Sequence, residues 1–142
     1  MVAQEKVYLE ITEAHPIDKV IEFQTEIIIK NLPAYYALVD GAVVGWADVQ
    51  RLEAPRRSHR GNLGMGLLPE VRRRGIGSAL LQAVIEHSKR IGIEKVELTV
   101  YTSNLAGIAL YKKFGFEQEG LIRQYRRVDG QNFDGLLMAK FL

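Results

Sequence analysis

The chain has 142 residues, of which 47% are hydrophobic and 25% are charged, as in an ordinary soluble globular protein. This length is enough for one domain with its own core, so we expect residues 1–142 to form a single domain. The absence of cysteine excludes disulfides, thiolate metal sites and a cysteine nucleophile. No apolar run is long enough to span a bilayer, and residues 1–6 lack the apolar centre of a signal peptide, so we expect a cytoplasmic protein without a membrane partner.

The net charge of +2 conceals an uneven distribution along the chain. Residues 1–54 carry 4 Lys and Arg against 9 Asp and Glu, whereas residues 55–142 carry 15 against 8. An anionic ligand is therefore expected beside the second part of the chain.

The first half of the chain predicts one helix and four strands. Runs of β-branched and aromatic residues indicate the strands, and Pro16 followed by apolar residues at helical spacing indicates the helix. Asp40-Gly41 between two apolar runs is a strong hairpin signal. The predicted elements are a strand at 7–12, a helix at 16–29, and an antiparallel meander at 35–39, 43–49 and 62–68, with a loop at 53–61.

The second half predicts two helices and three strands. An amphipathic segment and a short segment preceded by Asn104, a good N-cap, indicate the helices. The predicted elements are a helix at 75–91, a strand at 96–100, a helix at 105–114, a strand from 116, a hairpin turn at 129–130 and a strand at 132–142. A strand, a helix and a strand in succession imply a parallel crossover. We therefore expect the α/β class, with a mixed, mostly antiparallel sheet of about six to seven strands and helices on both faces.

The stretch from Gly64 to Ala79 carries the main functional signal. An apolar strand leads through a basic turn, residues 72–74, into the helix that starts near Gly75 and Gly77. The first N–H groups of a helix lack intrahelical partners and carry partial positive charge. Glycines let phosphates approach the backbone, and arginines add charged donors. The sequence therefore predicts an anion site, most simply for a pyrophosphate.

The pattern Arg72-x-x-Gly75-x-Gly77 after a strand resembles the acyl-CoA pyrophosphate turn, [QR]-x-x-G-x-[GA], of the GCN5-related N-acetyltransferase (GNAT) family. It is followed, at the family's distance, by LTVYTSNLAGIALYKKFGF from Leu98 to Phe116, which is similar to the family's next strand and helix. The resemblance covers about residues 35–142 and is greatest to bacterial members that acetylate amino acids and other small amines. It implies the GNAT acyl-CoA N-acyltransferase fold, with an abbreviated N-terminal part.

The resemblance implies an enzyme that moves an acetyl group from acetyl-CoA, its co-substrate, to a primary amine of a small molecule. The amine would attack directly in a ternary complex, with no metal. The alternatives are a protein N-terminal or lysine acetyltransferase and a catalytically degenerate acyl-CoA-binding protein. A basic nucleic-acid-binding domain is less favoured because the net charge is small, and we expect no nucleic-acid partner. A homodimer is a further expectation, since such assemblies are common in the family.

The resemblance also assigns roles to individual residues. The backbone N–H groups of residues 73–78 would hold the pyrophosphate, and a free N–H near Leu67 would stabilise the thioester oxygen. Asn104 would bind the pantetheine arm, and Tyr111 would give a proton to the leaving thiolate. The expected cofactor-binding residues are Leu67, Leu68, Arg72, Arg73, Arg74, Gly75, Ile76, Gly77, Ser78, Asn104 and Tyr111, with Leu67 and Tyr111 also acting in catalysis.

Each of these assignments has a structural alternative. The two glycines would relieve crowding at a helix start, the two leucines would belong to the core, Asn104 would only cap a helix, and Tyr111 would pack on the sheet. Replacement of Gly77 by Glu is expected to abolish pyrophosphate binding without disturbing the core. No general base is evident from the sequence, and the candidates are Glu10, Asp48, Glu53, His59 and Glu97.

Overall fold

The computed structural model describes residues 16–142, so the strand predicted at 7–12 lies outside the described residues. Within this range the chain forms three helices and six strands, and their bounds lie close to the predicted ones. In chain order they are α1 (Ile17–Ile29), β1 (Ala34–Val39), β2 (Ala42–Arg51), β3 (Arg60–Leu67), α2 (Ile76–Arg90), β4 (Lys95–Tyr101), α3 (Leu105–Lys113), β5 (Glu117–Val128) and β6 (Gln131–Phe141).

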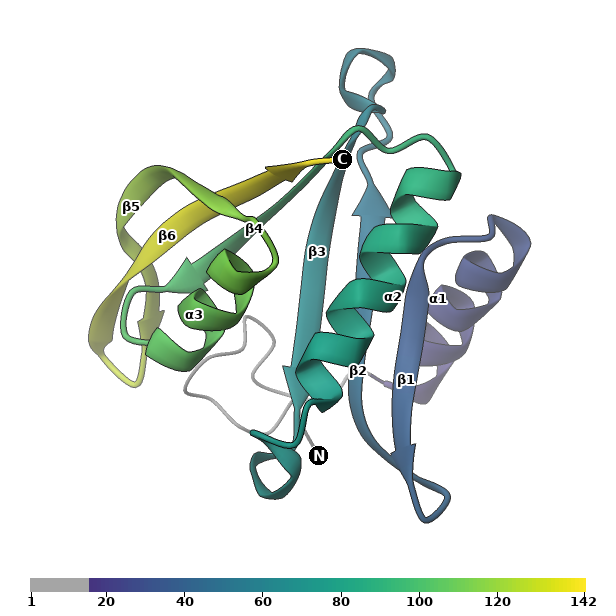
Figure 1. The fold of residues 1–142 in the computed structure, drawn as a ribbon, viewed down its shortest axis with the longest axis horizontal. Helices are drawn as coiled ribbons and strands as arrows, with labels where there is room; N and C mark the ends of the chain where they lie inside the picture. The colour runs from purple at the N-terminus through teal and green to yellow at the C-terminus, as the bar shows by residue number, and fades with distance from the viewer. Residues whose placement is uncertain (1–15) are drawn as a thin grey trace.

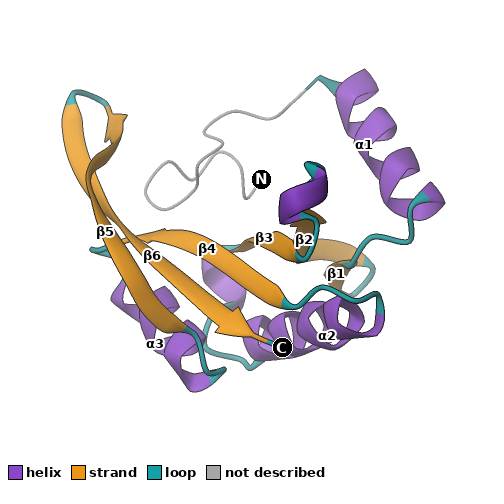
Figure 2. Ribbon diagram, turned by 90° about the horizontal axis from the view of Figure 1, so that it is seen from above, coloured by secondary structure: helices purple, strands orange, loops and turns teal. Residues whose placement is uncertain are grey.

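The six strands form one mixed sheet in the order β1-β2-β3-β4-β6-β5. β1, β2 and β3 are an antiparallel meander, β3 and β4 are parallel, and β4, β6 and β5 are antiparallel. Helices α2 and α3 cover one face, and α1 lies on the other side of the sheet (Figure 2). The predicted mixed α/β architecture is therefore confirmed.

The core lies between the sheet and the helices α2 and α3. Its centre contains Val49 of β2, Leu81 and Val84 of α2, Val96 of β4 and Met138 of β6, all of them 0% exposed. Full burial of such a side chain contributes about 1.5–3 kcal/mol. This packing fixes the axis of α2 against the central strands, and with it the position of the helix N-terminus.

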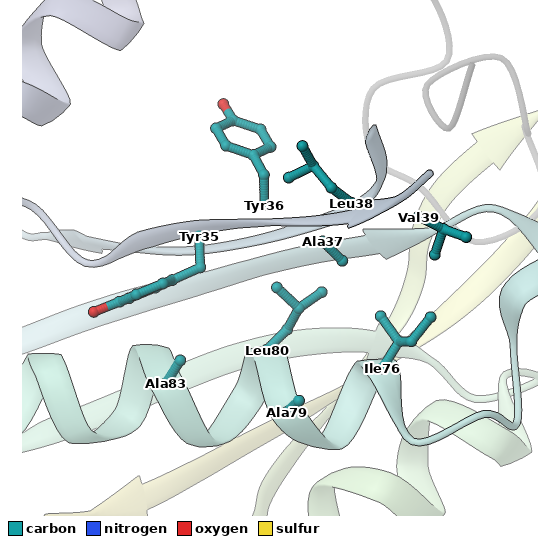
Figure 3. A pocket seen from close by; sticks show the side chains of 9 residues that line it. All are labelled: Tyr35, Tyr36, Ala37, Leu38, Val39, Ile76, Ala79, Leu80 and Ala83. Carbon is teal, nitrogen blue, oxygen red and sulfur yellow. The ribbon is translucent and has the colours of Figure 1, made fainter. Parts of the chain in front are cut away.

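The two faces of the sheet are defined by the side-chain alternation of β1. Figure 3 shows Tyr35 pointing toward α2 and Tyr36 pointing away from it. Tyr36 is paired with Trp46 of β2, and directly paired residues of antiparallel strands share a face. The side-chain amide of Gln24 in α1 donates a hydrogen bond to the Tyr36 hydroxyl. The side chains of Trp46 and of Asp48, two residues further along β2, therefore lie on the α1 face.

Candidate active site

The central strands β3 and β4 separate soon after they meet. Their pairing is confined to three residue pairs, the last of which is Asn62↔Glu97. Beyond it the two strands diverge (Figure 1). The rest of β3 thus has one edge paired with β2 and the other open toward β4.

Leu67 presents its backbone to this opening. The N–H of Leu68 donates to the carbonyl of Val44 in β2, with a nitrogen-to-oxygen distance of 2.9 Å. Successive residues of an antiparallel strand point their N–H groups in opposite directions, so the Leu67 N–H faces away from β2. Its side chain packs against the core, which confirms the core alternative for that side chain. Leu68 is half-buried.

A tight turn joins the end of β3 to α2. A 3₁₀ turn at Pro69–Val71 is followed by two residues in the left-handed region, Arg73 with φ of 59° and Gly75 with φ of 80°. The N–H of Ala79 bonds to the carbonyl of Gly75 at 3.0 Å. The N–H groups of residues 76–78 therefore have no intrahelical acceptor, and the helix N-terminus is suited to an anion.

The three arginines of this turn take different positions. The Nη2 of Arg72 donates to the backbone carbonyl oxygen of Leu67 at 2.9 Å, which ties the turn to the end of β3. Arg73 and Arg74 are exposed. The two exposed guanidinium groups stand beside the N-terminus of α2 and add to its positive potential.

The two glycines of the turn differ in what they require. An added Cβ at Gly75 would meet no atom of the described residues within 4 Å. Glycine is favoured at this position because it adopts the left-handed conformation without strain. An added Cβ at Gly77 would lie 3.2 Å from Cδ1 of Leu67 and 3.3 Å from Cδ2 of Leu110. A side chain at Gly77 would therefore require Leu67 and Leu110 to shift by a few tenths of an ångström, and the effect of glutamate at this position stays a prediction.

Asn104 caps α3, as the sequence predicted. Its Oδ1 accepts a hydrogen bond from the backbone N–H of Gly107 at 3.0 Å. This accounts for the choice of asparagine without any ligand. Contact with a pantetheine arm stays a prediction for the side-chain amide nitrogen.

Tyr111 lies on α3 and packs against the core, with its ring centroid 5.8 Å from that of Phe116. Within the described residues its hydroxyl forms no hydrogen bond. Burial raises the pKa of Tyr111 to about 12. The pKa of an ordinary phenol is about 10, so this hydroxyl is a weaker acid and stays protonated at neutral pH.

Four of the five candidate bases can be compared by their position relative to Leu67, and the fifth, Glu10, lies outside the described residues. Leu67 is the last residue of β3, which spans about 23 Å at about 3.3 Å per residue. His59 and Glu53 precede Arg60 at the opposite end of that strand. They are therefore remote from the Leu67 backbone.

The two remaining candidates lie nearer and differ in their partners. Glu97 is buried and forms an ion pair with Arg60, with an Nη2-to-Oε1 distance of 2.6 Å and a second contact from Nε to Oε2 of 3.1 Å. Asp48 is also buried and is paired across the sheet with Gly64. Burial raises its pKa, and a hydrogen bond from Gln50 partly opposes this. Asp48 is thus the carboxyl group nearest to Leu67 among these described candidates.

Trp46 and Gly64 were not singled out by the sequence, although both lie beside Asp48. Their position beside Asp48 follows from the alternation of side chains along the strands together with the register of β2 against β3. The alternation can be read from the sequence, but the register cannot. Among residues 16–142, no group of three or more His, Asp or Glu side chains is arranged to hold a metal ion. Nor does any helix in this range have the length and apolar character needed to cross a membrane.

A pocket of about 350 Å³ lies between β1 and α2 (Figure 3). Its walls carry no charged side chain, so it does not suit a pyrophosphate. Its lining residues are Tyr35, Tyr36, Ala37, Leu38, Val39, Ile76, Ala79, Leu80 and Ala83.

A mixed sheet that opens between two parallel strands, with a helix N-terminus suited to an anion after the first, is the arrangement of a class of acyl-CoA-dependent acyltransferases. The family model described as "Acetyltransferase (GNAT) family" matches residues 3–116. The chain belongs to this family.

Among its relatives is an L-amino acid N-acetyltransferase of Escherichia coli (strain K12), 36% identical over 105 residues, which cover 73% of this chain and 65% of the relative. An N-alpha-acetyltransferase of Sulfurisphaera tokodaii is 33% identical and is matched over 87% of this chain and 86% of its own length. The crystal structure of a phosphinothricin acetyltransferase from Sinorhizobium meliloti in complex with acetyl-CoA has a TM-score of 0.83 and 27% identity, covering 94% of this chain and 72% of that one. The chain thus spans slightly less than two thirds of the length of the first of these relatives.

Proposed function

We propose that this protein transfers the acetyl group of acetyl-CoA to the primary amine of a small molecule, an amino acid or a related amine. The observation that carries the proposal is the opening between β3 and β4 beside the N-terminus of α2. The opening offers the backbone N–H of Leu67 to a thioester, and the turn offers N–H groups and arginines to a pyrophosphate. Membership of the acetyltransferase family supports the same reaction.

Acetyl-CoA is a substrate in this proposal, and the residues of the turn suit its phosphates. The N–H groups of residues 73–78 would hold the pyrophosphate, and the exposed guanidinium groups of Arg73 and Arg74 would pair with its oxygens. Arg72 would act indirectly, because it holds the Leu67 carbonyl and so fixes the turn against β3.

In the proposed reaction the neutral amine attacks the thioester carbonyl carbon, a C–N bond forms and the C–S bond breaks. The N–H of Leu67 donates to the oxygen on which negative charge develops. The Tyr111 hydroxyl donates a hydrogen bond to the sulfur as it becomes a thiolate. The substrate ammonium gives up two protons in all, of which one ends on the CoA thiol and the other is released to solvent. Because the thioester is already activated, positioning supplies much of the rate.

The acceptor class is tested by a screen for CoA release. Purified protein and acetyl-CoA are incubated with each free L-amino acid, a set of polyamines, and a peptide with an N-terminal alanine, and free thiol is measured. Turnover with free amino acids or amines supports the proposal. Turnover with the peptide alone favours the second candidate, a protein N-terminal acetyltransferase, which the similarity to the archaeal N-alpha-acetyltransferase supports. Binding of acetyl-CoA without turnover of any amine would favour a degenerate acyl-CoA-binding protein.

A further inference from the structure

On the α1 face of the sheet, beside the opening between β3 and β4, β3 has a strip of two glycines that carry no side chain. Two residues of β3, Gly64 and Gly66, are paired with Asp48 and Trp46 of β2. Because paired residues share a face, both glycines lie on the same face as these two side chains. Neither glycine projects a side chain there, so the side chains that cover this part of β3 come from other segments, with Gly66 buried and Gly64 half-buried.

The side chains of β2 lean over this strip. An added Cβ at Gly64 would lie 3.0 Å from Oδ1 of Asp48 and 3.1 Å from Cζ3 of Trp46. The carboxylate and the indole ring therefore meet above the same glycine. A side chain at this position would separate them or displace both.

Asp48 differs from Glu97, the other buried carboxylate on this face, because no ion pair with a described residue balances its charge. Glu97 has Arg60 as its ion-pair partner. Asp48 is 8% exposed, its Oδ2 accepts a hydrogen bond from the neutral amide of Gln50 at 3.1 Å, and no Lys or Arg among residues 16–142 forms an ion pair with it. A buried carboxylate without a cationic partner is destabilising when ionised. The raised pKa of Asp48, whose first cause is burial, agrees with this picture.

We propose that Asp48 and Trp46 form the subsite for the acceptor, in which the substrate ammonium lies between the carboxylate and the indole ring above Gly64. This inference rests on the proposed function and names the chemistry that recognises its substrate. A carboxylate supplies the missing counter-charge, and the face of an indole ring attracts cations.

The subsite is placed for the reaction. Gly64 lies three residues before Leu67 on β3, so the bound ammonium lies about 10 Å along the strand from the Leu67 N–H. Asp48 accepts one proton from the ammonium at this subsite and later releases it to solvent, and the amine moves along β3 toward Leu67. The neutral amine then attacks the thioester, and no co-reactant is needed beyond acetyl-CoA.

The test uses the intrinsic fluorescence of Trp46, the only tryptophan in the chain. CoA-bound protein is titrated with methylammonium chloride, the smallest primary ammonium probe, against methanol and against sodium chloride at equal ionic strength. We expect a saturable change in fluorescence with methylammonium only. No change with methylammonium, or an equal change with methanol, would overturn the proposal. This readout needs no turnover, so it is independent of whether the acetyltransferase function holds.

The matched variants are Asp48→Asn and Asp40→Asn. Both remove one negative charge, and Asp40 lies in the exposed hairpin turn with φ of 50°, a conformation that asparagine tolerates. Asp48→Asn is expected to lose the methylammonium response and to lower kcat/KM by about 10- to 150-fold for the amine turned over fastest in the screen, with acetyl-CoA binding unchanged. The control is expected to keep wild-type values. Wild-type kinetics in Asp48→Asn would refute the subsite while leaving the proposed function intact.

Discussion

Removal of the Tyr111 hydroxyl tests its proposed catalytic role separately from the packing of its ring. In Tyr111→Phe the ring that packs beside Phe116 is retained and only the hydroxyl is lost. Tyr111 is half-buried, and its hydroxyl is not among the buried polar atoms left without a partner in the described residues, so its removal takes away no interaction that the fold needs. The free energy of unfolding is therefore expected to stay the same or to rise by about 1 kcal/mol.

The catalytic magnitude follows from the raised pKa. Tyr111 titrates at about 12, whereas an ordinary alkyl thiol such as cysteine titrates near about 8.5. Full transfer of the phenolic proton to the thiolate would thus be uphill by about 5 kcal/mol, at 1.36 kcal/mol per pKa unit. The hydroxyl is better suited to donate a hydrogen bond to the sulfur, which is worth about 1.5–3 kcal/mol for a charged acceptor. This corresponds to a loss of about 10- to 150-fold in kcat for Tyr111→Phe.

The assay is CoA release with the best amine of the screen, together with urea unfolding of both proteins. Because the wild-type phenol titrates at about 12, no loss of activity from ionisation of Tyr111 is expected between pH 7 and about pH 10. Activity of Tyr111→Phe within twofold of wild type would refute the role in catalysis. A large loss of stability would instead show that the hydroxyl is structural.

Three further predictions concern stability. Gly77→Ala is expected to lower the free energy of unfolding by about 1 kcal/mol, since crowding against Leu67 and Leu110 outweighs the better helix propensity of alanine; a gain in urea unfolding would contradict this. Arg60→Ala leaves the Glu97 carboxylate without its main partner and is expected to cost about 2 kcal/mol in the same assay, whereas a change near zero would show that the pair is neutral. Burial raises the pKa of Asp48 in the folded state above its unfolded value of about 3.9. At pH values between the unfolded and the folded pKa, the native state binds more protons than the unfolded state. Wild type therefore loses stability as the pH rises through this range. The melting temperature of Asp48→Asn should therefore rise relative to that of wild type as the pH increases from about 4. A difference in melting temperature that does not change with pH would contradict the burial argument.

The secondary structure was largely predictable because its signals are local. The Asp40-Gly41 hairpin, the amphipathic run of α2 and the Asn104 cap act within a few residues of the chain, and each is observed. The parallel pairing of β3 and β4 followed from the helix between them.

The site was predicted less completely because its details depend on contacts between distant segments. The direction of Arg72 is set by the Leu67 carbonyl, and the crowding at Gly77 by Leu110 on another helix. The role inferred for Asp48 depends on the register of β2 against β3, which places Gly64 beneath its carboxylate. No sequence pattern within a single segment indicates these three contacts.

The most direct test of the account is a calorimetric titration of acetyl-CoA into wild type and two charge-reversal variants. Arg73→Glu/Arg74→Glu changes the exposed arginines before α2, and Arg56→Glu/Arg57→Glu makes the same change in charge in the 3₁₀ turn Pro55–Arg57. We predict that wild type and the second variant bind alike, and that the first variant loses at least about 100-fold in affinity. No binding to wild type, or an equal loss in both variants, would contradict the assignment of this turn as the acetyl-CoA pyrophosphate site.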